Sequence, residues 1–342
     1  VTKFRAGDRV GVGCFVDSCR ECDMCEQGEE QFCTGTPSTI WTYNGIGRDG
    51  LPTAGGYSQG ITVEQDYLMH VPDGMPLEQA APLMCAGITT YNPLKRWGAG
   101  PGKRVGVVGL GGLGHMGVQF AAALGAETIV LSRTLAKRDD GLRFGATDYV
   151  STEDKARMRE LRGSFDLILS TVSDGVDLDG ILRLLKAHGV LVNVGLPAHP
   201  TTFSIGGLTG QARVLAGSNI GGIAETQQML DFCAEHKLAP MIEIIPASQI
   251  NEAHENVVAA KVRYRYVIDA ATIAEFLAKQ EVVSNVTHPS LASHPDHALA
   301  KRLLPRGSGS VFSFEVKGGR AAGRKLIESL SVFSHLANVG DA

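Results

Sequence analysis

A glycine-rich turn between a short apolar run and a helical stretch constrains the fold of this chain more than any other feature. The run Arg104–Val108 is followed by GLGGLG and then by a helical pattern that continues to Leu124. In G-x-G-x-x-G the first glycine permits a tight turn, the second lets the backbone approach a pyrophosphate, and the third lets helix and strand pack closely. The helix N-terminus adds unpaired N–H groups and the positive end of its dipole. In this strand–turn–helix context the pattern predicts a dinucleotide site formed by Gly109, Leu110, Gly111, Gly112, Leu113 and Gly114.

The alternation of apolar strands with helices continues through the middle of the chain. We predict strands at Phe165–Ser170, Val190–Val194 and Val214–Gly217, and helices at Val176–Lys186 and Glu225–His236. Buried strands that alternate with helices indicate an α/β fold with a doubly wound parallel sheet. Ligands bind outside the carboxyl ends of such strands. We therefore expect the cofactor groove to be completed by Thr171, Gly195, Ser218, Asn219 and Ile220.

The residues after the second strand of this region indicate which dinucleotide is bound. The strand Thr128–Leu131 leads into Ser132 and Arg133, with Lys137 one helical turn later, and no acidic residue occurs before Asp139. An NAD site places a carboxylate here to bind the ribose 2′-OH. A hydroxyl, a guanidinium and an ammonium suit a 2′-phosphate instead, which predicts NADP(H). The alternative is a solvated helix start with scattered positive charge.

Four cysteines near the start of the chain have the spacing of a metal site. Cys19, Cys22, Cys25 and Cys33 form C-x2-C-x2-C-x7-C. Four thiolates enclose Zn²⁺ tetrahedrally and leave no position for water or substrate, so the site is structural. Disulfides require an oxidising context, and no signal peptide is visible. The spacing also differs from that of a bacterial iron–sulfur cluster. We interpret Cys14 and Cys233 as small apolar residues, in a strand and a helix respectively.

Bulk composition excludes some functions. The net charge of −4 argues against nucleic-acid binding. The apolar stretch Val105–Ala126 is long enough to cross a bilayer, but its glycines cluster where the turn is expected, so we predict no membrane segment. The odd number of cysteines, seven, favours reduced thiols and a cytoplasmic protein.

Several motifs together resemble the zinc-dependent medium-chain dehydrogenases, in particular the cinnamyl-alcohol-dehydrogenase-like, NADP-dependent branch. Besides the cysteine quartet they are LMCAGITTYNPL, GLGGLGHMG and VRYRYVID, within residues 1 to about 272. The resemblance implies a Rossmann domain inserted in a GroES-like β domain, and a homodimer. It also implies the reduction of small-molecule aldehydes with NADPH or the oxidation of alcohols with NADP⁺.

The resemblance assigns roles to two further residues. Cys85, in LMCAGIT, would be a ligand of a catalytic zinc, and Thr89, one turn later, would lie beside the nicotinamide. The family's other catalytic ligands, a cysteine and a His–Glu pair, and its proton relay belong to sequence ahead of Val1. We therefore expect missing N-terminal residues, an incomplete catalytic site, and little or no turnover. The alternative is a non-catalytic module that binds NADP(H) and zinc.

The last 69 residues or so resemble a different family. Residues 274–342 are similar to the C-terminal domain of O-acetylhomoserine sulfhydrylase-type enzymes, which depend on pyridoxal phosphate, but the lysine and phosphate site of that family are absent. Within this segment we expect a strand at Val311–Val316, a helix at Ala321–Leu330, and local rather than metal-binding roles for His288, His294 and His297. Two fragments joined near Ala270–Ile273 suggest a fusion.

The expected domain divisions of the whole chain follow from the two resemblances. They are 1–88 (truncated GroES-like domain with the zinc lobe), 89–222 (Rossmann domain), 223–272 (return to the catalytic domain) and 273–342 (a small α+β fragment).

Overall fold

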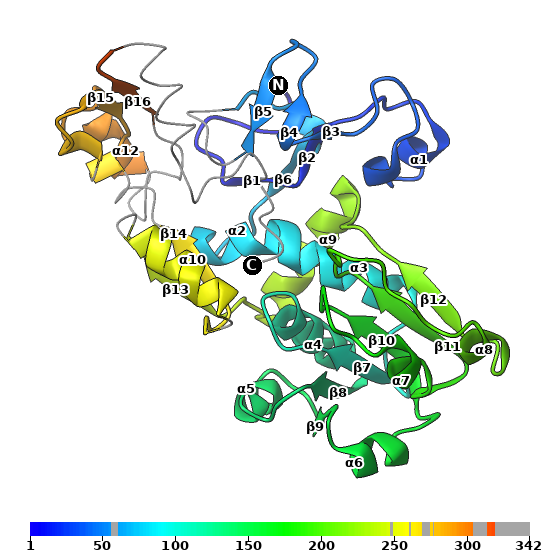
Figure 1. Ribbon diagram of the computed structural model, residues 1–342. Coiled ribbons are helices and arrows are strands. Elements are labelled where there is room, and N and C mark those ends of the chain that lie inside the picture. The colour runs from blue at the N-terminus through cyan, green and yellow to red at the C-terminus, as the bar shows by residue number, and fades with distance from the viewer. Residues whose placement is uncertain are drawn as a thin grey trace. The chain divides into compact units, whose positions relative to one another are not determined.

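The computed structural model of the chain describes residues 1–55, 61–246, 249–259, 261–268, 274–275, 277–303 and 313–318. These residues divide into two compact units (Figure 1). The first unit contains the described residues of Val1–Val71 and Ile242–Asn338, and the second contains Pro72–Met241. The predicted junction near Ala270–Ile273 and the predicted helix Ala321–Leu330 lie outside the described residues. Within them, no helix has the length and apolarity that crossing a membrane requires.

The second unit is built on a six-stranded parallel sheet with strand order β12-β11-β10-β7-β8-β9. Its strands are β7 (Arg104–Val108), β8 (Glu127–Ser132), β9 (Asp148–Ser151), β10 (Phe165–Ser170), β11 (Leu185–Asn193) and β12 (Val214–Gly217). In sequence order this is 3-2-1-4-5-6 from β9 to β12, the doubly wound arrangement whose strand order reverses between β7 and β10. The prediction of a doubly wound parallel sheet is confirmed.

Helices cover this sheet (Figure 1). The helices of the second unit are α2 (Leu77–Pro82), α3 (Ile88–Arg96), α4 (Gly114–Ala123), α5 (Arg138–Arg143), α6 (Lys155–Glu160), α7 (Leu178–Leu182), α8 (Gly206–Thr209) and α9 (Ile223–His236), with a π-helical segment at Leu83–Gly87 between α2 and α3. Strand residues such as Phe165, Ile168 and Leu191 are fully buried in the core. Strand positions enclosed on both faces account for the continuous apolar runs in the sequence.

The helix predicted over Val176–Lys186 is much shorter in the structure. Asp177 caps α7 by accepting a hydrogen bond from the Gly180 N–H at 2.9 Å, and the helix ends at Leu182. Leu185 already belongs to β11, where it is paired with Phe165 of β10. Strand pairing with a neighbour distant in sequence therefore overrides the local helical pattern.

The first unit contains short paired strands. Three antiparallel pairs join β1 (Val10–Val12) to β6 (Leu68–His70), β2 (Phe15–Asp17) to β3 (Ile40–Trp41), and β4 (Tyr43–Ile46) to β5 (Pro52–Ala54). The short helix α1 (Asp23–Glu26) lies between β2 and β3 in the sequence, and 3-10 turns occupy Glu30–Phe32 and Gln65–Tyr67. Cys14 is buried, as predicted, but it lies at a bend between β1 and β2 rather than in a strand.

The later part of the first unit adds two more strand pairs. β13 (Ile242–Ile245) and β14 (Arg265–Ile268) are parallel, connected through α10 (Ile250–Val258), and β15 (Val283–Thr287) is antiparallel to β16 (Ser313–Val316). The helix α12 (His297–Leu303) lies between β15 and β16 in the sequence. The His297 Nδ1 lies 2.9 Å from the Pro289 carbonyl oxygen, and the His294 Nδ1 accepts the Asp296 N–H at 3.1 Å, so both contacts are local.

An acidic residue at the amino ends of β7 and β10 gives a testable contribution to stability. The Asp166 carboxylate accepts the Arg104 N–H at 2.9 Å and the Lys186 ammonium at 2.8 Å. Burial raises the pKa of Asp166, but these hydrogen bonds outweigh it and hold that pKa below its ordinary value. A lowered folded-state pKa stabilises the fold above the unfolded-state pKa, and this contribution is lost as the pH falls through the folded value. We expect Asp166→Asn to cost about 1 kcal/mol at pH 7. Urea unfolding should show this difference shrink as the pH falls below about 4, the unfolded-state value, and disappear only below the lowered folded-state pKa. An equal difference at every pH would contradict the role of charge.

Candidate cofactor groove and metal centre

The glycine turn after β7 is shaped so that two of its glycines cannot be replaced without collision. A Cβ on Gly114 would lie 2.1 Å from the Gly109 carbonyl oxygen, and a Cβ on Gly109, where φ is +88°, would lie 2.6 Å from Val172 Cγ2. Gly111 differs, because a Cβ there meets no protein atom within 4 Å. A glycine with open space above it fits a turn that leaves room for a ligand beside the backbone.

Positive charge lies beside this turn at the end of β8. The Lys137 ammonium donates to the Leu110 carbonyl oxygen at 3.3 Å, so it lies over the glycine turn itself. The Arg133 side chain is exposed, and its carbonyl oxygen accepts the Ser151 hydroxyl at 2.8 Å. The Ser132 side chain is hydrogen-bonded to Tyr149. The Ser132 hydroxyl therefore ends β8 and two cations follow it, and the chain from Ser132 to Arg138 has no carboxylate.

Hydrogen bonds connect the carboxyl end of β7 to that of β10, and the carboxyl end of β11 to that of β12. The Thr171 hydroxyl donates to the Val108 carbonyl oxygen at 2.9 Å, and the Ser218 N–H donates to the Asn193 carbonyl oxygen at 3.3 Å. Gly195 approaches the neighbouring loop so closely that a Cβ would lie 2.3 Å from the Val172 carbonyl oxygen. Ile220 is buried and has a φ of +40°. The predicted groove residues thus lie on ordered loops at the sheet edge where ligands bind in this fold.

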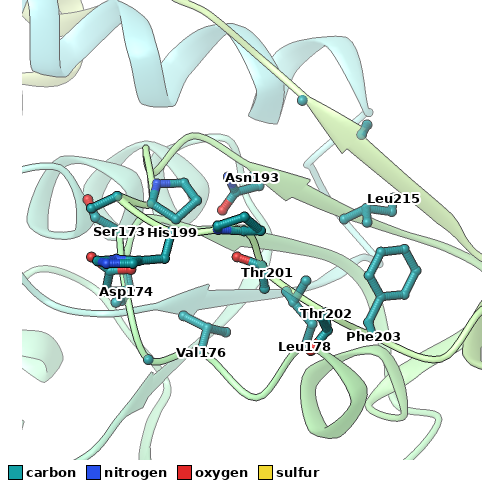
Figure 2. A pocket seen from close by; sticks show the side chains of 17 residues that line it. Ser173, Asp174, Val176, Leu178, Asn193, His199, Thr201, Thr202, Phe203 and Leu215 are labelled. Carbon is teal, nitrogen blue, oxygen red and sulfur yellow. The ribbon is translucent and has the colours of Figure 1, made fainter.

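A pocket of about 790 Å³ opens beside these loops (Figure 2). Its apolar wall includes Val176, Phe203 and Leu215, and its polar residues include Asp174 and His199. None of the residues predicted to bind the cofactor lines it, although Val172 and Gly217 are direct neighbours of Thr171 and Ser218. Sequence reasoning did not find this pocket, because its lining comes from two loops and from residues of β11 and β12, without a common motif.

Cys85 and Thr89 lie one helical turn apart, in the π-helical segment and at the start of α3. Thr89 is buried and Cys85 half-buried. In the part of the chain that the structure describes, Cys85 belongs to no group of three or more potential metal ligands. Among those same residues, the single group of that kind is the cysteine quartet.

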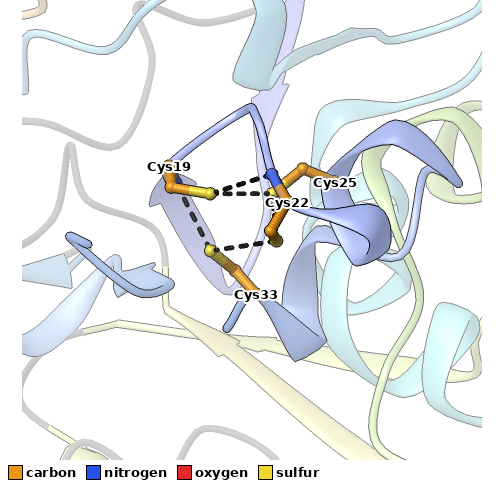
Figure 3. Close-up of side chains that lie close together, drawn as sticks. All are labelled: Cys19, Cys22, Cys25 and Cys33. Carbon is orange, nitrogen blue, oxygen red and sulfur yellow. Dashed lines mark hydrogen bonds between the residues drawn. The ribbon is translucent and has the colours of Figure 1, made fainter. Parts of the chain in front are cut away.

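The four sulfurs of Cys19, Cys22, Cys25 and Cys33 converge in the first unit (Figure 3). All lie within 4.8 Å of one another, and the Sγ–Sγ separations include 3.9 Å for Cys19–Cys25, 3.6 Å for Cys22–Cys25 and 3.8 Å for Cys22–Cys33. A tetrahedron with Zn–S bonds of about 2.3 Å has edges of about 3.8 Å. The quartet therefore fits a four-coordinate zinc ion.

Backbone N–H groups point at the sulfurs as they do around thiolates. The Cys19 sulfur accepts from the N–H groups of Glu21 and Cys22 at 3.4 and 3.3 Å, and the Cys33 sulfur accepts from the Cys19 N–H at 3.4 Å. The backbone N–H groups of Cys25 and Thr34 lower the pKa of the Cys22 thiol to about 5. Donors of this kind favour the deprotonated form that a metal requires.

Sequence reasoning missed the side chains around this quartet. Ser18 and Tyr67 are both buried, and their hydroxyls lie 2.6 Å apart next to Cys25. Asp17 pairs with Arg20 at 2.9 Å and also with Arg48. The contact of Ser18 with Tyr67 joins residues 49 positions apart, so no local spacing pattern indicates it.

Comparison with known proteins relates this geometry to a family. The chain is 59% identical over 273 residues to NADP-dependent alcohol dehydrogenase C 1 of Mycolicibacterium smegmatis, covering 80% of this chain and 78% of the relative. The chain belongs to the zinc-dependent medium-chain alcohol dehydrogenases. It is also 53% identical, over 80% of its length and 78% of the relative, to the probable formaldehyde dehydrogenase AdhA of Bacillus subtilis. Residues 1–73 match the alcohol dehydrogenase GroES-like domain, and residues 112–235 match the zinc-binding dehydrogenase family.

Solved structures agree with membership of the zinc-dependent alcohol dehydrogenases. Cinnamyl alcohol dehydrogenase from Sorghum bicolor matches with a TM-score of 0.75 and 43% identity, covering 79% of this chain and 76% of that chain. The Helicobacter pylori enzyme, solved with NADP(H), matches with a TM-score of 0.72 and 42% identity, covering 79% and 77%. The predicted combination of a Rossmann-like parallel sheet with a GroES-like domain is therefore confirmed, and the chain is by family an NADP-dependent oxidoreductase.

A second family matches the C-terminal part of this dehydrogenase chain. Residues 208–342 match the Cys/Met metabolism PLP-dependent enzymes. This match begins well ahead of the predicted junction at 273 and overlaps the zinc-binding dehydrogenase match over residues 208–235. A match to the second family is thus present over these residues, but the overlap does not locate a junction, and the fusion stays a prediction.

Proposed function

We propose that the chain binds NADP(H) with its pyrophosphate on the Gly109–Gly114 turn and its 2′-phosphate beside Ser132, Arg133 and Lys137. The open space above Gly111, in a turn whose Leu110 carbonyl oxygen accepts from the Lys137 ammonium, is the observation that carries this proposal. Charge-assisted hydrogen bonds from Arg and Lys are suited to a dianionic phosphate. The positive end of the helix dipole at the start of α4 favours the pyrophosphate.

The remaining groove residues would orient the nicotinamide half of the cofactor. Thr89 lies at the start of α3, and Thr171, Gly195 and Ser218–Ile220 follow the carboxyl ends of β10, β11 and β12. Gly195 would let the cofactor approach the backbone, while buried Ile220 would exclude water from one side of the ring. Holding donor and acceptor carbons in one orientation is the main contribution that such residues make to hydride transfer.

We propose that Cys19, Cys22, Cys25 and Cys33 hold a structural zinc, and that Cys85 is one ligand of a catalytic zinc site. A catalytic zinc polarises a carbonyl oxygen as a Lewis acid, and NADPH supplies the hydride. Such a zinc needs three protein ligands, and among the described residues Cys85 belongs to no such group. The proposed function is alcohol oxidation and aldehyde reduction by a homodimer. Because Cys85 belongs to no such ligand group among the described residues, we propose that this polypeptide turns over weakly. The alternative is a non-catalytic module that binds NADP(H) and zinc.

An assay of NADPH oxidation separates these two functions. The 342-residue protein would be incubated with NADPH and a panel of aliphatic and aromatic aldehydes, while NADPH binding is followed by fluorescence in parallel. Binding with slow aldehyde-dependent oxidation supports the enzyme, and binding without any oxidation supports the module. Rapid oxidation would show that a complete catalytic site exists and would overturn the proposal of weak turnover.

Replacing Arg133 tests the preference for NADP(H) over NAD(H). We expect Arg133→Ala to weaken NADPH binding about tenfold to a hundredfold, since one hydrogen bond to a charged group is lost, and to leave NADH binding unchanged. Arg162→Ala is the matched control. Arg162 is an exposed arginine that precedes β10, so it lies at the amino ends of the parallel strands, whereas Arg133 lies at their carboxyl ends. Fluorescence titration with both cofactors measures the effect. An equal loss for both cofactors would contradict a 2′-phosphate contact.

We further propose that residues from about 273 onward derive from a PLP-dependent enzyme and carry no pyridoxal chemistry, with domain divisions at 88, 222 and 272. The match of residues 208–342 to that family supports a shared origin. Added pyridoxal phosphate should produce no protein-bound visible absorbance band, because the lysine that would form the Schiff base is not part of this segment. Long-read sequencing of the source locus tests the fusion: one uninterrupted reading frame with its own start codon would reject it.

A further inference from the structure

A buried serine adjoins one sulfur of the cysteine quartet. The Ser18 side chain has no exposed surface, and its Oγ lies 3.1 Å from Cys25 Sγ and 2.6 Å from the Tyr67 hydroxyl. Its backbone is fixed on both sides, because the Ser18 N–H donates to Asp17 Oδ1 at 2.8 Å and its carbonyl oxygen accepts from Arg48 at 2.8 Å. The serine is therefore held in place independently of the metal centre.

The direction of the two hydrogen bonds follows from proton counting. A metal-bound thiolate carries no proton and only accepts, so with zinc bound the Ser18 hydroxyl would donate its one hydrogen bond to the Cys25 sulfur. The Ser18 oxygen then accepts from Tyr67, whose phenol keeps its proton because burial raises its pKa. The order is Tyr67 O–H to Ser18 O–H to Cys25 S⁻. Hydrogen bonds arranged in such a chain polarise and strengthen one another.

Tyr67 is itself held by its neighbours. It is 3% exposed, its ring meets Phe15 edge to face at 6.0 Å between centroids, and the Arg20 guanidinium lies 5.3 Å from the ring centroid. The donor end of the chain is thus fixed by packing, while the acceptor end is a sulfur on the short helix α1. Hydrogen bonds of this type orient metal ligands and change the reactivity of the ligand atom.

We propose that Ser18 and Tyr67 are positioning residues for the metal centre, which hold the Cys25 sulfur on the zinc and shield it from electrophiles. The proposal rests on the structural zinc of the proposed function. A donated hydrogen bond draws electron density from the sulfur lone pair, so losing the bond makes that sulfur a stronger nucleophile. Without Ser18, Cys25 becomes the first sulfur of the quartet to react, and the zinc is lost with it.

Alkylation by N-ethylmaleimide reports this difference. The Cys25 lone pair forms an S–C bond to the maleimide, and the electron pair of the broken C=C π bond takes a proton from water and leaves hydroxide. The resulting thioether is uncharged and a poor zinc ligand, so the Zn–S bond breaks. Zinc release is followed with a chromogenic chelator, and peptide mapping identifies the first cysteine to be alkylated.

The experiment compares four forms of the 342-residue protein. We expect Ser18→Ala to release zinc about tenfold faster than the unmodified protein, the effect of one lost hydrogen bond to a charged acceptor, with Cys25 alkylated first. Tyr67→Phe keeps the serine donor and should accelerate release less. Ser38→Ala is the matched control, because Ser38 is exposed in the same lobe and should leave the rate unchanged. A Ser18→Ala protein that purifies without zinc, while Ser38→Ala retains it, also supports the proposal.

The outcomes distinguish this inference from the metal site on which it rests. If the unmodified protein contains no zinc, the metal site and the inference fail together. If it holds zinc, but Ser18→Ala and Tyr67→Phe release it at the unmodified rate, the inference alone is overturned. First alkylation of Ser18→Ala at a cysteine other than Cys25 overturns it as well.

Discussion

Replacing Gly111 with alanine is expected to abolish NADPH binding while leaving the melting temperature of the protein unchanged. The added methyl group meets no protein atom within 4 Å, and Gly111 is not among the glycines with positive φ, so the fold has no reason to respond. The same methyl group would occupy the space where the cofactor pyrophosphate approaches the turn. Fluorescence titration with NADPH and a thermal unfolding scan of the same preparation measure the two quantities.

Gly114→Ala provides the contrast for this prediction. Its Cβ would lie 2.1 Å from the Gly109 carbonyl oxygen, which is backbone and cannot move aside without distorting the turn. This variant should therefore lose both NADPH binding and thermal stability. If Gly111→Ala bound NADPH as tightly as the unmodified protein, the pyrophosphate would lie elsewhere and the proposed groove would be wrong.

Replacing Cys22 with serine is expected to reduce the zinc content from about one to about zero per chain and to unfold the lobe around the quartet. The Cys22 sulfur lies 3.6 Å from that of Cys25 and 3.8 Å from that of Cys33, so its replacement leaves the zinc with only three thiolate ligands. Structural zinc contributes about 10–16 kcal/mol of binding free energy in small zinc-dependent folds, and that energy is folding energy there. Metal analysis measures the zinc content. Limited proteolysis of the whole protein, with the cleavage sites within residues 1–71 identified, measures the unfolding of this region.

Cys85→Ser is the matched control for the zinc prediction. Cys85 is also a half-buried cysteine, but it is not part of the quartet. Its replacement should leave the zinc content at about one. A Cys22→Ser protein that kept its full zinc would show that the metal is bound elsewhere.

The parallel sheet was largely predictable because its signal is local. The strands Arg104–Val108, Phe165–Ser170 and Val214–Gly217 have the predicted bounds, since buried strands appear in a sequence as short apolar runs bounded by turns. The helix predicted at Val176–Lys186 fails where pairing of β10 with β11 at Leu185 requires a strand. Such pairing joins distant segments and leaves no periodic pattern in the sequence.

In the candidate site, too, the sequence predicted the features that rest on local patterns and missed those that rest on contacts between distant residues. The cysteine spacing and the glycine turn are local patterns, and in the structure the four sulfurs converge and Gly111 faces open space. The contact of Ser18 with Tyr67 and the pocket near Phe203 arise from tertiary packing, and neither has a spacing that marks it. Motif reasoning therefore finds ligand atoms more readily than the side chains that hold them.

The zinc content of the purified 342-residue protein, measured by mass spectrometry of the metal, tests the central claim most directly. We expect one zinc per chain, held by the cysteine quartet. Two zinc ions per chain would contradict the proposal that the catalytic site is incomplete, and none would contradict the metal centre itself.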